Sequence, residues 1–149
     1  MKNLVVEKID SERRDLALEL SFRVFLECNS CDYNEEGMKL FNKFINDEES
    51  IKMLTIYGAF INGILVGVIG SKNNGSHISL FFVEKEYQGY GIGRKLFDAF
   101  IEDTKANHIT VSSSTTAVKV YKKMGFKQIA APKTNNGLIS VPMEYRNEL

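Results

Sequence analysis

A short glycine-rich turn between a strand-like segment and a helix-like segment constrains this chain more than any other feature. The apolar run from His77 to Val83 predicts a strand. Gly89, Gly91 and Gly93 follow at every second position, and a segment with helical periodicity begins directly after them. Because glycine has no Cβ, several backbone N–H groups can converge there on one point at the helix N-terminus. Such a point carries about half a positive charge and unsatisfied donors, so the turn is suited to holding phosphate groups.

Two familiar phosphate-binding loops do not fit this turn. A Walker A loop requires G-x-x-x-x-G-K-[ST], and no such run occurs in the sequence. A dinucleotide G-x-G-x-x-G loop starting at Gly89 would need glycine at position 94, which is Arg94, and the strands before it look hairpin-linked. The pattern that does fit is Q-x-x-G-x-G, formed by Gln88, Gly91 and Gly93. The alternative is a turn that only lets a strand meet a helix.

The remaining periodicities predict an alternation of helices and strands. Leu4 to Ile9 is expected to be a strand, followed by a helix from about Ser11 to Glu27 and a second helix carrying Met38, Phe41 and Ile45. Asp32 with Glu35 resembles a capping box for that second helix. The later strands are expected at 53–60, 64–70, 76–83, 109–111, 126–130 and 138–145, with Asn62-Gly63 forming a two-residue hairpin turn. Pro142 cannot donate a ladder hydrogen bond, so the last strand should be at an edge or bulged there.

A second motif lies downstream of the turn. A polar cluster, residues 112–116, follows the short apolar run 109–111. Ala117, Val120, Tyr121 and Met124 then repeat at helical spacing, and Gly125 is placed to end that helix. Tyr121 therefore lies on the inward stripe of a short helix.

The two motifs together resemble those of the GNAT superfamily of acyl-CoA N-acyltransferases, at the spacing usual for that family. The Q-x-x-G-x-G turn is similar to the family's acetyl-CoA pyrophosphate loop, and Ala117, Tyr121, Gly125 and Phe126 match its A-x-x-x-Y-x-x-x-G-F pattern. Many members have Asn seven residues before the tyrosine, where this chain has Ser114. The segment around 24–37 looks like a bacterial subgroup with no settled substrate.

The resemblance implies one α/β domain over residues 1–149. Its fold would be a mixed, mostly antiparallel sheet of about six or seven strands with about four helices. The strand before the glycine loop and the strand after its helix would splay apart, and the pantetheine arm of CoA would lie between them.

The resemblance also implies a site. Tyr121 corresponds to the family's general acid and His77 to the position of a general base, with Glu84 or ordered water as the alternatives. A backbone N–H at Phe82 or Val83 would stabilise the oxyanion. The residues expected to bind acetyl-CoA are Phe81, Phe82, Val83, Gln88, Gly89, Tyr90, Gly91, Ile92, Gly93, Arg94 and Ser114.

The implied activity is transfer of an acetyl group from acetyl-CoA to a primary amine of a small molecule or peptide, by direct attack in a ternary complex. A catalytically silent CoA-binding sensor is the alternative, and an unrelated phosphate-binding module is a second. Glu27, Asp32, Glu35 and Glu36 cluster around the first interhelical loop and could form an acidic wall for a cationic amine.

Composition argues against several other classes of function. The 19 basic and 19 acidic residues balance, so nothing draws the chain to nucleic acid or to an anionic membrane. The longest apolar stretch, Gly58 to Gly70, is too short to span a bilayer. The N-terminus does not resemble a signal peptide, so a cytoplasmic protein is expected. The expected oligomeric state is a monomer or a homodimer. Cys28 and Cys31 form a C-x-x-C without a second ligand pair, so we expect incidental thiols and no metal, with a redox disulfide as the alternative.

Overall fold

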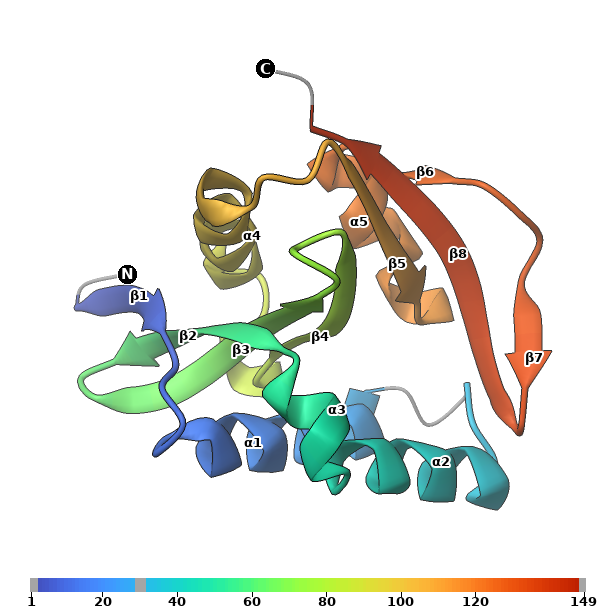
Figure 1. Cartoon of the computed structure of the whole chain (residues 1–149), viewed down its shortest axis with the longest axis horizontal. Helices are drawn as coiled ribbons and strands as arrows, with labels where there is room; N and C mark the ends of the chain where they lie inside the picture. The colour runs from blue at the N-terminus through green and yellow to red at the C-terminus, as the bar shows by residue number, and fades with distance from the viewer. Residues whose placement is uncertain (1–2, 29–31, 148–149) are drawn as a thin grey trace.

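One mixed sheet organises the chain, and helices cover both of its faces (Figure 1). The structure is a computed structural model and describes residues 3–28 and 32–147. Its first half contains β1 (Leu4–Lys8), α1 (Arg14–Cys28), α2 (Glu35–Ile45), α3 (Glu48–Lys52), β2 (Thr55–Ile61), β3 (Ile64–Lys72) and β4 (His77–Val83). Its second half contains the 3-10 turn η1 (Lys85–Tyr87), α4 (Ile92–Asp103), β5 (His108–Ser113), the 3-10 turn η2 (Thr115–Ala117), α5 (Val118–Met124), β6 (Lys127–Gln128), β7 (Lys133–Asn135) and β8 (Leu138–Arg146).

The strands lie in the order β1-β2-β3-β4-β5-β8-β6, with β7 paired to β8. Every pair is antiparallel except β4 with β5, so the predicted mixed, mostly antiparallel α/β sheet is confirmed. The predicted hairpin turn between β2 and β3 is also confirmed, because Asn62 and Gly63 both have positive φ, of 51° and 81°.

Some predicted elements differ from the structure. The one-turn helix α3 was not predicted, because five residues are too few to show a helical period. The strand predicted over 126–130 is shorter, and a separate strand β7 pairs with β8 near the turn. Pro142 lies inside β8, opposite Ser112 of β5, and its carbonyl accepts from Ile129 N–H at 3.0 Å. Because the nitrogen and the carbonyl of a strand residue face the same side, the Pro142 nitrogen, which has no hydrogen to donate, also faces β6. β6 has already ended at Gln128, so β8 is locally an edge at Pro142, as expected.

Two hydrophobic clusters hold the helices to the two faces of the sheet. On one face, Leu96, Phe97, Tyr121 and Phe126 pack around α4 and α5. On the other face, the α1 and α2 side chains pack over β2, β3 and β4, with the Phe25 and Phe41 rings stacked at 4.2 Å. Fully burying side chains of this kind stabilises the fold by about 1.5–3 kcal/mol each.

Strands β4 and β5 are joined over a very short length. Their parallel pairing consists of His77 with Thr110 and Ile78 with Val111. The next residue, Ser79, is the extra residue of a β-bulge, because Ile78 pairs with Ser71 whereas Leu80 pairs with Gly70. A bulge bends its strand, so β4 leaves β5 at Ser79 and the two strands diverge. We call the space between their diverging ends the gap, and the end at Ile78 and Val111 its vertex; this splay was predicted.

A segment from the first half of the chain docks against the second half. Asn34 N–H donates to Gly137 O at 3.0 Å, and Ile139 N–H donates to Asp32 O at 2.7 Å. The approach is close, because a Cβ added at Gly37 would lie 2.3 Å from Gly137 O. The start of α2 is thereby fixed to the tip of the β7–β8 hairpin.

The capping role predicted for Asp32 is wrong. Asn34 is the N-cap of α2 and its Oδ1 accepts from Gly37 N–H at 3.0 Å. The Asp32 side chain is 2% exposed and instead accepts from both the N–H and the hydroxyl of Thr115 in η2. A buried carboxylate of the first half thus holds the segment that begins α5.

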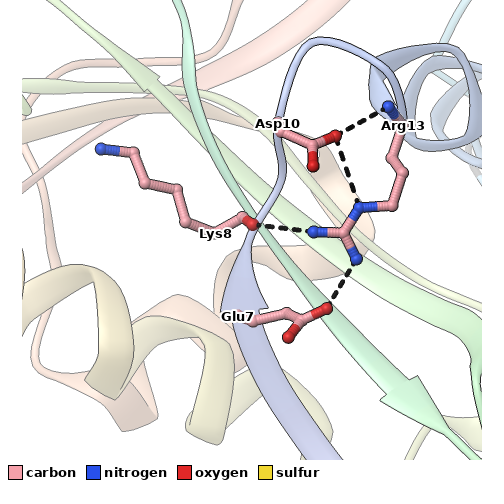
Figure 2. A network of polar contacts seen from close by, with 4 residues as sticks. All are labelled: Glu7, Lys8, Asp10 and Arg13. Atoms are coloured by element: carbon pink, nitrogen blue, oxygen red, sulfur yellow. Dashed lines mark hydrogen bonds and ion pairs between the residues drawn. The ribbon is translucent and has the colours of Figure 1, made fainter.

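A partly exposed arginine fixes the turn that leads from β1 into α1. Figure 2 shows the Arg13 guanidinium donating to Glu7 Oε1 at 2.6 Å and to the Lys8 carbonyl at 3.2 Å. Asp10 accepts from the Arg13 backbone N–H at 3.0 Å, and the guanidinium lies 5.3 Å from the centre of the Phe60 ring. These contacts position the start of α1 at the outer end of the sheet, away from the gap.

We expect Asp32→Ala to lower the free energy of unfolding by about 2 kcal/mol, because the N–H and hydroxyl of Thr115 lose their acceptor. Asp32→Asn should lose less, since its oxygen can still accept from the N–H while its amide donates to the Thr115 hydroxyl. Urea unfolding measures both losses. Asp47→Asn is the control, because its carboxylate is exposed and accepts from Ser50 Oγ at 2.8 Å. Equal losses in Asp32→Ala and the control would contradict the bridging role of Asp32.

Candidate functional site

The glycine turn lies at the open end of the gap, between the end of β4 and the start of α4. Gly89 and Gly91 have left-handed φ values of 89° and 81°. The first helical hydrogen bond runs from Lys95 N–H to Gly91 O at 3.1 Å. The N–H groups of residues 92–94 therefore precede the hydrogen-bond ladder of α4 and remain available as donors.

The surface of this turn is open to a ligand. A Cβ built at Gly89 or Gly91 would meet no atom within 4 Å, so backbone groups, not side chains, form the surface there. Successive N–H groups beside a left-handed residue at a helix start form a concavity suited to anions. The residues present therefore fit an anion such as a diphosphate group.

Side chains around the turn hold its shape. Gln88 Nε2 donates to Val83 O at 2.9 Å, which closes the turn against the end of β4. Arg94 is in an i,i+4 ion pair with Asp98 at 3.1 Å on the exposed surface of α4. Tyr90 is 61% exposed. The backbone N–H groups of this turn are therefore better placed to bind an anionic ligand than the Arg94 guanidinium, which is paired with Asp98.

The register of β4 decides which backbone groups face the gap. Glu84 N–H donates to Val66 O at 2.8 Å, so this pair is hydrogen-bonded across to β3. Antiparallel pairs alternate, so Phe82, which pairs with Val68, also directs its N–H and carbonyl to β3. The N–H groups of Phe81 and Val83 then face the gap. Of the two oxyanion donors expected from the sequence, the Val83 N–H faces the gap and the Phe82 N–H faces β3, whereas the Phe81 N–H, which was not expected as an oxyanion donor, also faces the gap.

Tyr121 closes the gap on the α5 side. Its ring packs edge-on against Phe81 at 5.8 Å and against Phe126 at 5.1 Å, and the residue is 7% exposed. Burial raises the pKa of its hydroxyl above the ordinary tyrosine value, so the group stays protonated.

Ser114 occupies the other side of the open end of the gap. Its Oγ accepts from Ala117 N–H at 3.2 Å and lies 3.2 Å from Thr116 Oγ1, which makes it the N-cap of η2. The Ser114 hydroxyl, which was predicted to contact the cofactor, is therefore already engaged as the N-cap of η2. Asp32 reinforces the same segment through Thr115.

His77 lies at the vertex, about 20 Å along β4 from its C-terminal end. Its Nδ1 is 2.7 Å from Thr110 Oγ1, and that hydroxyl is 3.4 Å from Ser76 O. If the hydroxyl donates to Ser76, the His77 tautomer has its proton on Nδ1 and leaves Nε2 as the basic nitrogen. Burial, with the nearby Lys72 charge, lowers the pKa of His77, so the ring is neutral at neutral pH.

Glu84, the alternative base, is already engaged. Both of its carboxylate oxygens accept from Arg23 Nη1 of α1. This ion pair links α1 to the segment after β4 and raises the pKa of Arg23. The Glu84 carboxylate is therefore occupied by Arg23 in this structure.

The acidic residues of the first interhelical loop do not form one wall. Glu27 lines a groove of about 880 Å³ between α1 and the α2–α3 segment, whereas Glu35 and Glu36 line a separate shallow depression. Asp32 lines neither of them and is turned toward Thr115. The sequence predicts incidental thiols at Cys28 and Cys31, with a redox disulfide as the alternative. Both side chains lie outside the part of the chain that the structure describes.

Two absences hold for the part of the chain that the structure describes. Residues 3–28 and 32–147 contain no cluster of three His, Cys, Asp or Glu side chains that could hold a metal ion. In those same ranges, none of the helices combines the length and the apolar character that crossing a bilayer requires.

Comparisons with known proteins agree with this arrangement. A family model described as an acetyltransferase (GNAT) domain matches residues 29–147. A relative from Bacillus subtilis, the uncharacterized N-acetyltransferase YitH, is 32% identical over 87 residues, which are 53% of this chain and 31% of that protein.

Solved structures share the fold over nearly the whole chain. A GCN5-related N-acetyltransferase from Rhodopseudomonas palustris has a TM-score of 0.82 at 20% identity, covering 98% of this chain and 97% of that one. The PaiA N-acetyltransferase from Thermoplasma acidophilum, solved in complex with coenzyme A, has a TM-score of 0.75 at 17% identity, covering 96% and 98%. At these identities the likeness concerns the fold.

The lowered pKa of His77 predicts a pH-dependent loss of stability. As the pH falls below about 6.5, the unfolded chain takes up a proton at this residue that the folded chain resists, so the free energy of unfolding falls until the folded pKa is passed. We expect the decrease between about pH 7.5 and pH 5.5 to be smaller in His77→Gln than in the original chain. Urea unfolding at the two pH values measures it, and an identical decrease in both proteins would show that His77 titrates normally.

Proposed function

Because this chain belongs to the GNAT family of acetyltransferases, we propose that it transfers an acetyl group from acetyl-CoA to a primary amine of a small molecule or peptide. The observation that carries the proposal is the gap between β4 and β5, with the anion-binding turn at its open end and His77 at its vertex. A ligand with phosphates at one end and a reactive group at the other would fit this gap, with its phosphates at the turn and its reactive group toward His77.

The proposed binding mode uses backbone groups. The N–H groups of residues 89–94 hold the diphosphate, and the exposed β4 edge at Phe81 and Val83 pairs with the amides of the pantetheine arm. Ser114 and η2 border the other side of the arm. The acyl thioester then lies toward the vertex of the gap.

In the proposed reaction the amine nitrogen attacks the thioester carbonyl within a ternary complex. The new C–N bond places an electron pair on the carbonyl oxygen, which the Phe81 N–H stabilises. When that pair returns, the C–S bond breaks and the thiolate leaves. The nitrogen gives up its proton and the sulfur receives one.

His77 is the proposed proton acceptor. An alkyl ammonium with a pKa near 10.4 pays about 4.6 kcal/mol at pH 7 to become the neutral nucleophile, so a nearby base accelerates the attack. The lowered pKa of His77 keeps the ring neutral and able to accept. Phe81 lies four positions after His77, about 13 Å along β4, so we propose that a chain of waters carries the proton from the amine to Nε2.

Tyr121 is the proposed proton donor to sulfur. The raised pKa of its hydroxyl makes it a weak acid, but burial raises the pKa of a thiolate in the same environment as well. A protonated hydroxyl can therefore donate its hydrogen bond as the C–S bond breaks. The alternative function, a silent CoA sensor, would not require a proton acceptor at His77 or a proton donor at Tyr121.

A panel of primary amines tests the proposal. Each amine is incubated with acetyl-CoA and the protein, and a thiol reagent detects the free CoA released. Protein-dependent release that saturates with one class of amine is the expected result. CoA binding by calorimetry without release for any amine would favour the sensor.

A matched pair of glycines tests the phosphate turn. Gly91 and Gly63 both have φ of 81° and no atom within 4 Å of an added Cβ. Alanine at either position should therefore lower the free energy of unfolding equally, by about 1–2 kcal/mol. Only Gly91→Ala should weaken CoA binding by calorimetry, because its methyl group stands among the N–H donors. Equal CoA affinity in the two variants would exclude the turn as the binding site.

Removing the Tyr121 hydroxyl tests the acid. Tyr121→Phe keeps the ring contacts with Phe81 and Phe126, so stability and CoA affinity should change little. The turnover number should fall by about 10²-fold, within the range for a positioned acid. Phe126→Leu is the control for disturbed packing, since it alters the same cluster and leaves the hydroxyl. Unchanged turnover in Tyr121→Phe at saturating amine would reduce the residue to a packing role.

A further inference from the structure

Ser79 combines two properties that no other described residue shares. It is the extra residue of the β4 bulge, so it lies at the vertex, immediately after the last pair with β5. Its Oγ is also the one enclosed side-chain polar atom without a hydrogen-bond partner among the described residues. A buried hydroxyl without a partner destabilises the folded state, and such groups are rare in native proteins.

The surroundings of the bulge suggest what the hydroxyl can meet. The residue as a whole is half-buried although its Oγ is enclosed, so other atoms of Ser79 already reach accessible space. A serine χ1 angle has three staggered wells, and no hydrogen bond holds this side chain in one of them. A ligand in the gap can therefore draw the hydroxyl out by a rotation about one bond.

The distance along β4 indicates which part of the ligand lies next to Ser79. Val83 lies four positions after Ser79, which corresponds to about 13 Å of strand. A pantetheine arm has roughly the length of four residues of extended chain. With phosphates held at the glycine turn, the thioester end of the arm arrives near Phe81 and Ser79.

We propose that the Ser79 hydroxyl is a second oxyanion donor, which acts on the thioester carbonyl together with the Phe81 N–H. This inference rests on the proposed acetyl transfer. During the attack, the oxygen gains the electron pair of the carbonyl π bond, and two donors from one strand edge then share that charge. As the C–S bond breaks and the carbonyl re-forms, both donors keep their protons.

The proposal predicts an unusual combination of effects for Ser79→Ala. The free energy of unfolding should stay equal or rise, because the variant deletes an unpartnered polar atom. Turnover should fall by about 10²- to 10³-fold, the usual effect of removing one oxyanion donor. Acetyl-CoA affinity should fall by about five-fold while the affinity for free CoA, which has no carbonyl at this position, is unchanged.

Ser21→Ala is the matched control. Ser21 is a fully buried serine of α1 whose Oγ donates to Ala17 O at 2.8 Å. Its alanine variant should lose stability and keep turnover and both affinities, the opposite of the result expected for Ser79→Ala.

Urea unfolding, calorimetry with CoA and with acetyl-CoA, and the amine assay together decide the matter. Unchanged turnover in Ser79→Ala, an equal drop in CoA and acetyl-CoA affinity, or a loss of stability like that of the control would each overturn the proposal. Failure of the original chain to bind either CoA species would instead reject the proposed function. The two failures are therefore distinguishable.

Discussion

The backbone ladder between β4 and β5 consists of two residue pairs, His77 with Thr110 and Ile78 with Val111, and the rest of the site follows from that short ladder. Beyond it, the bulge at Ser79 leaves N–H and carbonyl groups of an internal strand edge without a strand partner. Backbone groups of this kind need a partner when they are removed from water. An extended ligand that contains amides can pair with these groups in place of a strand, and we propose this interruption of the sheet as the binding surface.

A sheet joined so weakly in its middle needs other contacts to fix the width of the gap. The buried Asp32 carboxylate on Thr115, the docking of α2 against Gly137, and the ring contact between Phe81 and Tyr121 each connect the two parts. The first two come from the segment that precedes α2, far from the gap in sequence. Changes in that segment therefore alter the geometry of η2 and α5, and through them the position of Tyr121, without touching a ligand.

The parts of the site that sequence predicts are those with local causes. Alternate glycines before a helical period specify the turn, and Asn62-Gly63 specifies a hairpin through the positive φ values that this turn needs. The contact of Asp32 with Thr115 spans 83 residues, and its local context favoured a helix cap instead. The bulge at Ser79 and the choice between Phe81 and Phe82 depend on register with β3, which the pattern of apolar residues in β4 does not encode.

Burial has opposite consequences for the two titratable groups of the gap, and this is what makes them complementary. It lowers the pKa of His77 and raises that of Tyr121, so both side chains are neutral at neutral pH, one able to accept a proton and the other able to donate one. In the proposed reaction, one proton taken up by His77 and one released by Tyr121 leave the net charge of the site unchanged over the full transfer. In this proposal negative charge develops on the carbonyl oxygen during the attack, and the low dielectric that shifts both pKa values also strengthens the hydrogen bonds to this oxygen.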